Sequence, residues 1–61
     1  MVIINYSEYV PGLFVMNNNN KEWGIGQIQS SIDQKITVNF ENVGKKVLNI
    51  EKISLEIVEI K

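Results

Sequence analysis

The feature that most constrains the fold of this chain is a strict alternation of apolar and polar residues near its middle. From Lys35 to Phe40 every second residue is apolar, namely Ile36, Val38 and Phe40, and the residues between them are polar. A period of two places successive side chains on opposite faces of a β-strand. This segment therefore predicts a strand with one buried face and one face toward water.

Further short strands are predicted on both sides of this one. They are expected over residues 13–17, 24–32 and 45–50 and in a C-terminal segment that contains Leu55 and Ile57. Asp33-Gln34 is short enough for a tight hairpin, and Gly44 can provide the next turn. In the C-terminal segment Val58 and Ile60 lie on the opposite phase from Leu55 and Ile57, so we expect either a bulge or burial on both sides.

No segment predicts a convincing helix. Ile53, Ile57 and Ile60 have helical spacing, but the β-branched residues around them favour a short turn followed by a strand. Five short strands in 61 residues cannot cover both faces of a flat sheet. We therefore expect an all-β fold of one domain, a small and strongly bent barrel with an N-terminal arm over residues 1–9 and a barrel core over residues 10–61.

The predicted core and the predicted loops follow from the same patterns. Ser30 lies on the inward phase of its strand, and the run from Asn17 to Asn20 is expected to be an exposed loop. The core candidates are Val15, Ile28, Ile32, Ile36, Val38, Phe40 and Leu48.

The composition argues against an enzyme. The chain has no Cys and no His, which excludes a thiol nucleophile, a disulfide and a histidine-based metal site. Its carboxylates are scattered, and a barrel this small has its interior filled by side chains. We expect no catalytic residues, no metal site and no cofactor.

The sequence also gives no indication of a membrane or an export signal. The longest apolar runs, such as Leu13 to Met16, are far shorter than the ~20 residues of a membrane span. The first residues lack the basic and apolar regions of a signal peptide. We therefore expect a cytoplasmic protein.

An ordered set of motifs carries a resemblance over residues 10–57. The motifs are Pro11-Gly12-x-Phe14-Val15, Trp23-Gly24-Ile25-Gly26-Gln27-Ile28, Val38-Asn39-Phe40-Glu41 and Gly44-Lys45-Lys46-Val47. This set resembles a family of short bacterial proteins with an uncharacterised domain. It is also similar to the C-terminal Tudor-like segment of UvrD/PcrA-type DNA-repair helicases, although Leu13 stands where those families favour Asp. The resemblance implies an SH3-like barrel of the Tudor or KOW type that contacts RNA polymerase.

Trp23 follows the polar loop and precedes a strand. One interpretation is that it caps the barrel end, half-buried against Phe14 or Pro11. The other is that it contacts a partner, because Trp is over-represented at binding hot spots. Both can hold together, since Trp is rarely buried completely.

Lys45-Lys46 is the only adjacent basic pair in the chain. It is interpreted either as a solvated hairpin rim or as a contact to phosphate or to an acidic protein. The net charge of −1 and the lack of Arg weigh against nucleic acid as the main partner. Stacking of bases on Trp23 and Phe14 keeps nucleic acid as a second hypothesis.

Gly24-Ile25-Gly26 does not predict a nucleotide site. A dinucleotide fingerprint needs a third Gly and a following helix within a βαβ unit. Here the two glycines open an expected hairpin, where they allow a sharp bend or a close approach of the backbone.

Together these features predict a non-catalytic interaction module with Trp23, Phe14, Lys45 and Lys46 as its partner-binding residues. The expected partner is a protein, and by resemblance it is RNA polymerase. The alternatives are weak binding of nucleic acid through the same residues and a structural homo-oligomer. An apolar N-terminal arm that contains Val2, Ile3 and Ile4 is interpreted either as a cover of the barrel or an added edge strand, or as the contact of a homodimer.

Overall fold

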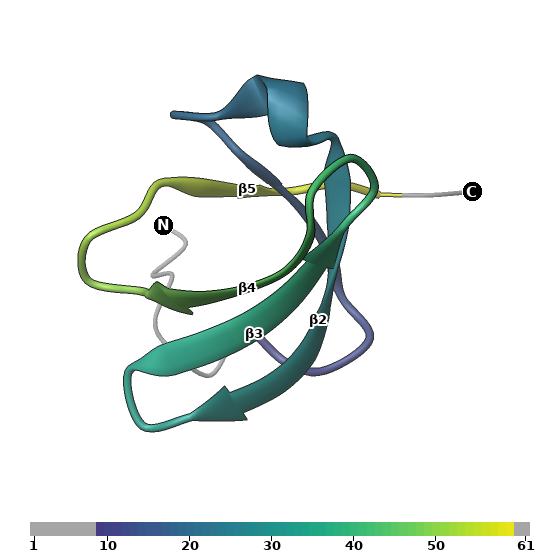
Figure 1. The fold of residues 1–61 in the computed structure, drawn as a ribbon. Helices are drawn as coiled ribbons and strands as arrows, with labels where there is room; N and C mark the ends of the chain where they lie inside the picture. Colours follow the sequence, from purple (N-terminus) through teal and green to yellow (C-terminus); the bar gives the residue numbers. More distant parts are fainter. Residues whose placement is uncertain (1–8, 60–61) are drawn as a thin grey trace.

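The computed structural model describes residues 9–59, which form five strands and one short 3₁₀ helix (Figure 1). The elements are β1 (Phe14–Asn17), η2 (Lys21–Trp23), β2 (Ile25–Ile32), β3 (Lys35–Phe40), β4 (Gly44–Asn49) and β5 (Leu55–Ile57). The five expected strands are thus confirmed. The N-terminal arm, with the dimer contact assigned to it, lies outside the described residues apart from Tyr9.

All five strands belong to one antiparallel sheet with the order β4-β3-β2-β1-β5. The first four strands follow one another as a meander, and β5 returns to pair with β1. The sheet curls on itself around a single core, and β2 takes part in both halves of it (Figure 1). The expected all-β, five-stranded, SH3-like barrel is therefore confirmed.

The core lies on the inner face of this sheet. Five of the expected core residues, Val15, Ile28, Ile36, Val38 and Phe40, are at most 2% exposed, and Leu48 packs against them while only partly buried. The core also contains Ile50, which follows β4. Partly buried side chains that surround the core include Tyr9, Leu13, Trp23, Ile53 and Leu55.

The prediction that Ile32 belongs to the core is wrong, because a bulge changes the phase of β2. Ile28 lies opposite Val38, but the next pair is Ser30 with Thr37, so Gln29 has no direct partner on β3. The extra residue reverses which side chains face inward beyond it. Ile32 is 69% exposed as a result, and Ser30 lies on the outer face instead of the predicted inner face.

The Asp33-Gln34 turn joins β2 and β3 as predicted, with Ile32 opposite Lys35. Asp33 has φ 56, a left-handed conformation that Asp tolerates better than most residues. Its short side chain thus takes the place of the Gly that tight hairpins often use.

Asn17 corrects the expectation of a fully exposed asparagine loop. It ends β1 with only 3% exposure, and its side-chain Oδ1 accepts the Asn19 N–H at 2.9 Å. This local bond is an Asx turn, which Asn forms readily. Asn18 and Asn19 are exposed, while Asn20 is partly buried and is the N-cap residue of η2.

The C-terminal segment is a turn followed by a strand, as expected. β5 ends at Ile57, and the N–H of Val58 still donates to the Phe14 carbonyl at 2.9 Å. β5 itself contains no bulge, Val58 lies beyond its end, and Ile60 lies outside the described residues. Within residues 9–59 no helix is long and apolar enough to span a membrane.

Candidate functional site

Trp23 lies at the end of η2 and is half-buried against the core. Its indole meets the Phe40 ring edge to face, with ring centroids 5.2 Å apart and an interplanar angle of 65°. Such a pair stabilises a fold by about 0.5–1.5 kcal/mol beyond the burial of its surface. Trp23 thus closes one end of the core, and the ring that it packs against is Phe40, where the sequence predicted Phe14 or Pro11.

Lys46 also contacts Trp23, through its ammonium group. It lies directly opposite the buried Val38 in the β3–β4 ladder, so its side chain leaves the strand on the inner face. The Nζ atom lies 5.4 Å from the centre of the Trp23 ring, within the range of a cation–π interaction. The lysine stem packs beside the core while the ammonium group caps Trp23.

The turn between β3 and β4 fixes the backbone beneath Trp23. Glu41 makes two hydrogen bonds to Ile25. Its backbone N–H donates to the Ile25 carbonyl at 3.0 Å, and its side-chain Oε1 accepts the Ile25 N–H at 2.9 Å. Asn42 donates its backbone N–H to the Trp23 carbonyl and its side-chain Nδ2 to the Glu22 carbonyl. Four hydrogen bonds therefore hold η2 and the start of β2 against this turn.

Gly24 permits this close approach. It has φ 81, and a Cβ at this position would lie 2.9 Å from Glu41 Oε1 and 3.0 Å from Asn42 Nδ2. Any other residue would be strained by the backbone angle and crowded by the turn. The expected role of the glycine pair, close approach of the backbone, is confirmed at this position.

The contact between Lys46 and Trp23 can be measured by a double-mutant cycle. Lys46→Met keeps the stem and removes the charge, and Trp23→Leu removes the aromatic face. We expect the two changes to couple by about 0.5–1 kcal/mol in urea unfolding. The matched control is Lys45→Met, which should show no coupling to Trp23→Leu because Lys45 leaves β4 on the outer face. Equal coupling for both lysines would contradict the assignment.

A second group of residues forms a row across the outer face of the sheet. Phe14 on β1 lies opposite Gln27 on β2, Gln27 lies opposite Asn39 on β3, and Asn39 lies opposite Lys45 on β4. Phe14 is half-buried, and the other three side chains are exposed. We call these four residues the transverse row. It places an aromatic ring, two amides and an ammonium group in line across four strands.

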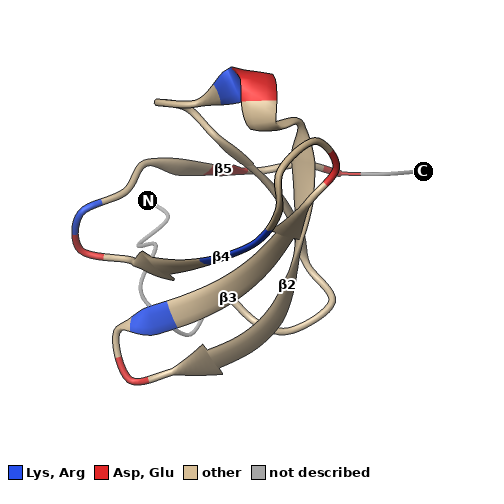
Figure 2. Cartoon of the chain, viewed as in Figure 1, with Lys and Arg blue, Asp and Glu red and all other residues tan. Residues whose placement is uncertain are grey.

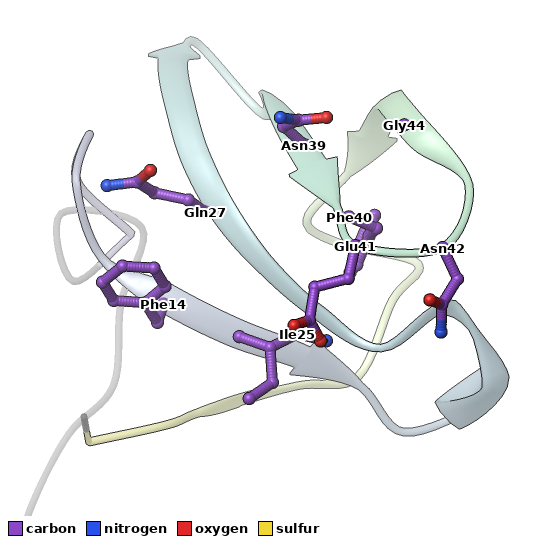
Figure 3. Close-up of a pocket in the computed structure, with 8 residues that line it drawn as sticks. All are labelled: Phe14, Ile25, Gln27, Asn39, Phe40, Glu41, Asn42 and Gly44. Carbon is purple, nitrogen blue, oxygen red and sulfur yellow. The ribbon is translucent and has the colours of Figure 1, made fainter.

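A shallow groove of about 490 Å³ lies beside the transverse row. In Figure 3, Phe14 and Gln27 project from β1 and β2, and the Glu41 side chain extends toward Ile25. The groove is lined by Phe14, Ile25, Gln27, Asn39, Phe40, Glu41, Asn42 and Gly44. It therefore offers an apolar contact at Phe14 and Ile25, amide donors and acceptors in the middle, and one carboxylate.

The four residues predicted as the binding site do not form one surface. Trp23 contacts both Phe40 and Lys46, whereas Phe14 and Lys45 lie at opposite ends of the transverse row. The lysine pair is divided because neighbouring residues of a strand point to opposite faces. The sequence alone predicts no binding role for Gln27 or Asn39, which become candidates only once the register between strands is known.

Charges of both signs are interspersed over the described part of the chain (Figure 2). Lys21 adjoins Glu22 on η2, and Glu51 adjoins Lys52 in the turn after β4. No surface of a single sign results in this part of the molecule. Among residues 9–59 no three His, Cys, Asp or Glu side chains are grouped so that they could hold a metal ion.

The fold and this surface define a small all-β, barrel-like domain with an open groove on its outer face. A family model described as a protein of unknown function (DUF3553) matches residues 9–58. The chain belongs to this family, and the expected membership of a family with an uncharacterised domain is confirmed. No curated protein and no solved structure matches the chain.

Proposed function

We propose that this protein is a non-catalytic interaction module that binds a protein partner through the transverse row and the adjoining groove. The observation that carries the proposal is the alignment of Phe14, Gln27, Asn39 and Lys45 across four strands. Phe14 provides an aromatic anchor, the kind of side chain that dominates binding energy at interfaces. The two amides can bond to the backbone of a partner, and Lys45 provides a charged rim.

The partner that we propose is part of the transcription or DNA-repair machinery in the cytoplasm, with RNA polymerase as the first candidate. This choice rests on the resemblance to the Tudor-like segment of UvrD/PcrA-type helicases. Trp23 and Lys46 then have an indirect role, since they hold η2 and the β3–β4 turn beside the groove. The N-terminal arm stays a predicted dimer contact.

Weak binding of single-stranded nucleic acid to the same surface is the second candidate. Phe14 could stack on a base, and the amides of Gln27 and Asn39 could bond to base edges. Two observations favour a protein over nucleic acid. Glu41 places a carboxylate in the groove, and Lys46 points to the inner face, which leaves Lys45 as the only lysine of the transverse row. One phosphate contact supports little affinity.

The test is binding of purified bacterial RNA polymerase to the immobilised chain. We expect Phe14→Ala to weaken binding by at least about tenfold, as truncation of an aromatic anchor does. Because Phe14 is half-buried, Gln27→Ala is the variant that leaves the fold intact, and it should also weaken binding. Gln27 is exposed, and within residues 9–59 its side chain makes a single long hydrogen bond, from Nε2 to the Gly12 carbonyl at 3.4 Å.

Lys52→Ala is the matched control, because Lys52 is an exposed lysine in the turn after β4 and lies outside the groove. It should bind as the unmodified chain does. A parallel titration with a single-stranded oligonucleotide at low salt separates the two candidates. If the oligonucleotide causes salt-sensitive amide shifts confined to the groove and polymerase does not bind, the partner is nucleic acid and the protein-partner proposal is wrong.

A further inference from the structure

The outer margin of β4 is open in the described part of the molecule. β4 is an edge of the five-stranded sheet and is twice as long as β5, the other edge, with six residues against three. Within residues 9–59, the stretch from Gly44 to Leu48 makes backbone hydrogen bonds to β3 alone. Half of the N–H and C=O groups of this strand therefore point away from the sheet, as in any edge strand.

Two exposed apolar side chains lie on the outer face near this edge. Val47 is 67% exposed in the middle of β4, and Ile32 is 69% exposed at the end of β2. Both line a second depression of about 420 Å³, which also contains Thr37 of β3. An open edge beside an exposed apolar patch is typical of a surface that pairs with another strand.

We propose that β4 pairs antiparallel with β4 of a second copy, centred on Val47, and so joins two sheets into one. In this register Val47 meets its own counterpart, Lys45 lies opposite Asn49, and Lys46 lies opposite Leu48. No lysine then faces a lysine. A register centred on Lys46 would oppose two like charges, which destabilises a strand pair.

The Val47 register also suits the rest of the surface. Both copies of Val47 and Ile32 fall on the same face of the joined sheet, because directly opposite residues share a face. The depressions that they line then continue into each other across the new strand pair. The net charge of −1 gives little repulsion between copies, and a chain near neutrality associates more readily than a strongly charged one. A second copy therefore fits the hydrogen bonding of this edge, and this register avoids directly opposed lysines.

Single-cysteine cross-linking tests this pairing directly, since the chain has no Cys of its own. Opposite residues of an antiparallel pair have Cα atoms about 4.5–5.5 Å apart, which a disulfide can span. Val47→Cys should therefore form a covalent dimer under mild oxidation about tenfold faster than Val10→Cys, a control with a 48% exposed side chain before β1. A mixture of Lys45→Cys and Asn49→Cys chains should form the mixed disulfide in preference to either homodimer.

Light scattering with size exclusion provides the non-covalent test. A single strand edge buries less than a standard interface, so the measurement is made at chain concentrations of about 0.1–1 mM. We expect a mass approaching twice 7.0 kDa, with Val47→Lys weakening the dimer by at least about tenfold and Val10→Lys leaving it unchanged. A monomer at the highest concentration overturns the proposal. The proposal is also overturned if the chain forms a dimer but Val47→Cys cross-links no faster than Val10→Cys. The contact between copies would then lie elsewhere than at β4.

Discussion

Gly26→Ala should destabilise the domain by about 3 kcal/mol, the upper end of the range for overpacking a core. Gly26 is buried on the inner face of β2, between Val15 on β1 and Phe40 on β3. A Cβ at this position would collide with Val38 Cγ1 and would lie 2.7 and 2.8 Å from two carbons of the Phe40 ring. Val38 and Phe40 are both almost fully buried, so neither can move aside at low cost.

Thermal unfolding followed by circular dichroism measures this effect. For a domain of this size a loss of 3 kcal/mol lowers Tm by roughly 10–20 °C. The stability of a 61-residue domain is about 3–9 kcal/mol, so much of it would be lost. The control is the double variant Gly26→Ala/Val38→Ala, in which the new methyl group occupies space vacated by Val38.

Relative to Val38→Ala, the double variant should lose less stability than Gly26→Ala loses relative to the unmodified chain, because the collision with Val38 is removed while the close contacts with the Phe40 ring remain. Fully additive losses would show that the collision with Val38 contributes nothing to the cost at Gly26. Gly12→Ala isolates the other kind of glycine cost, because Gly12 has φ +95 and a Cβ there would have no neighbour within 4 Å. Its expected loss of about 1–2 kcal/mol comes from strain in the backbone alone.

The central strands could be predicted because they are buried on one face only. From Lys35 to Phe40 the exposed and buried positions alternate as the residue types do, and the register with β4 continues this pattern without interruption. Local sequence and tertiary burial agree there, so alternation alone identified Ile36, Val38 and Phe40 as core residues. Where the two agree, a pattern of period two is sufficient.

The sequence predicts burial wrongly at two kinds of position. At one, an extra residue changes which side chains of a strand face inward; at the other, a polar side chain is buried. The bulge at Gln29 leaves no mark in composition, since Gln27 and Gln29 look like successive outward positions. Ile32 was therefore assigned to the core although it is exposed. Asn17 was assigned to the solvent because asparagine favours loops, but its bond to the Asn19 N–H satisfies the buried amide oxygen.

The candidate surface was only partly predictable for a related reason. Lys45 and Lys46 are neighbours in sequence, but they point to opposite faces of β4. The transverse row brings together Phe14 and Lys45, which are far apart in sequence, through Gln27 and Asn39. Such a row depends on three separate strand registers, and each of these depends on turns and on a bulge. Sequence spacing therefore cannot reveal it.

Phe40→Ala should unfold the domain. Truncation of a buried Phe costs about 3–5 kcal/mol, and here the edge-to-face contact with Trp23 is lost as well. That sum is comparable with the whole expected stability of about 3–9 kcal/mol. Loss of dispersed amide signals in the NMR spectrum, together with emission from Trp23 typical of an exposed indole, would show the unfolded chain.

Phe40→Leu is the variant that separates packing from the aromatic contact. Leucine fills most of the volume but has no ring, so we expect a folded domain that is less stable by about 1–2 kcal/mol. Trp23 is the only tryptophan in the chain, so its fluorescence reports on the surroundings of this one indole. A change in Trp23 emission with unchanged amide dispersion would indicate that the ring of Phe40 positions the indole. Unchanged emission in folded Phe40→Leu would instead mean that Lys46 and the β3–β4 turn are enough to hold Trp23, and that Phe40 acts only as core.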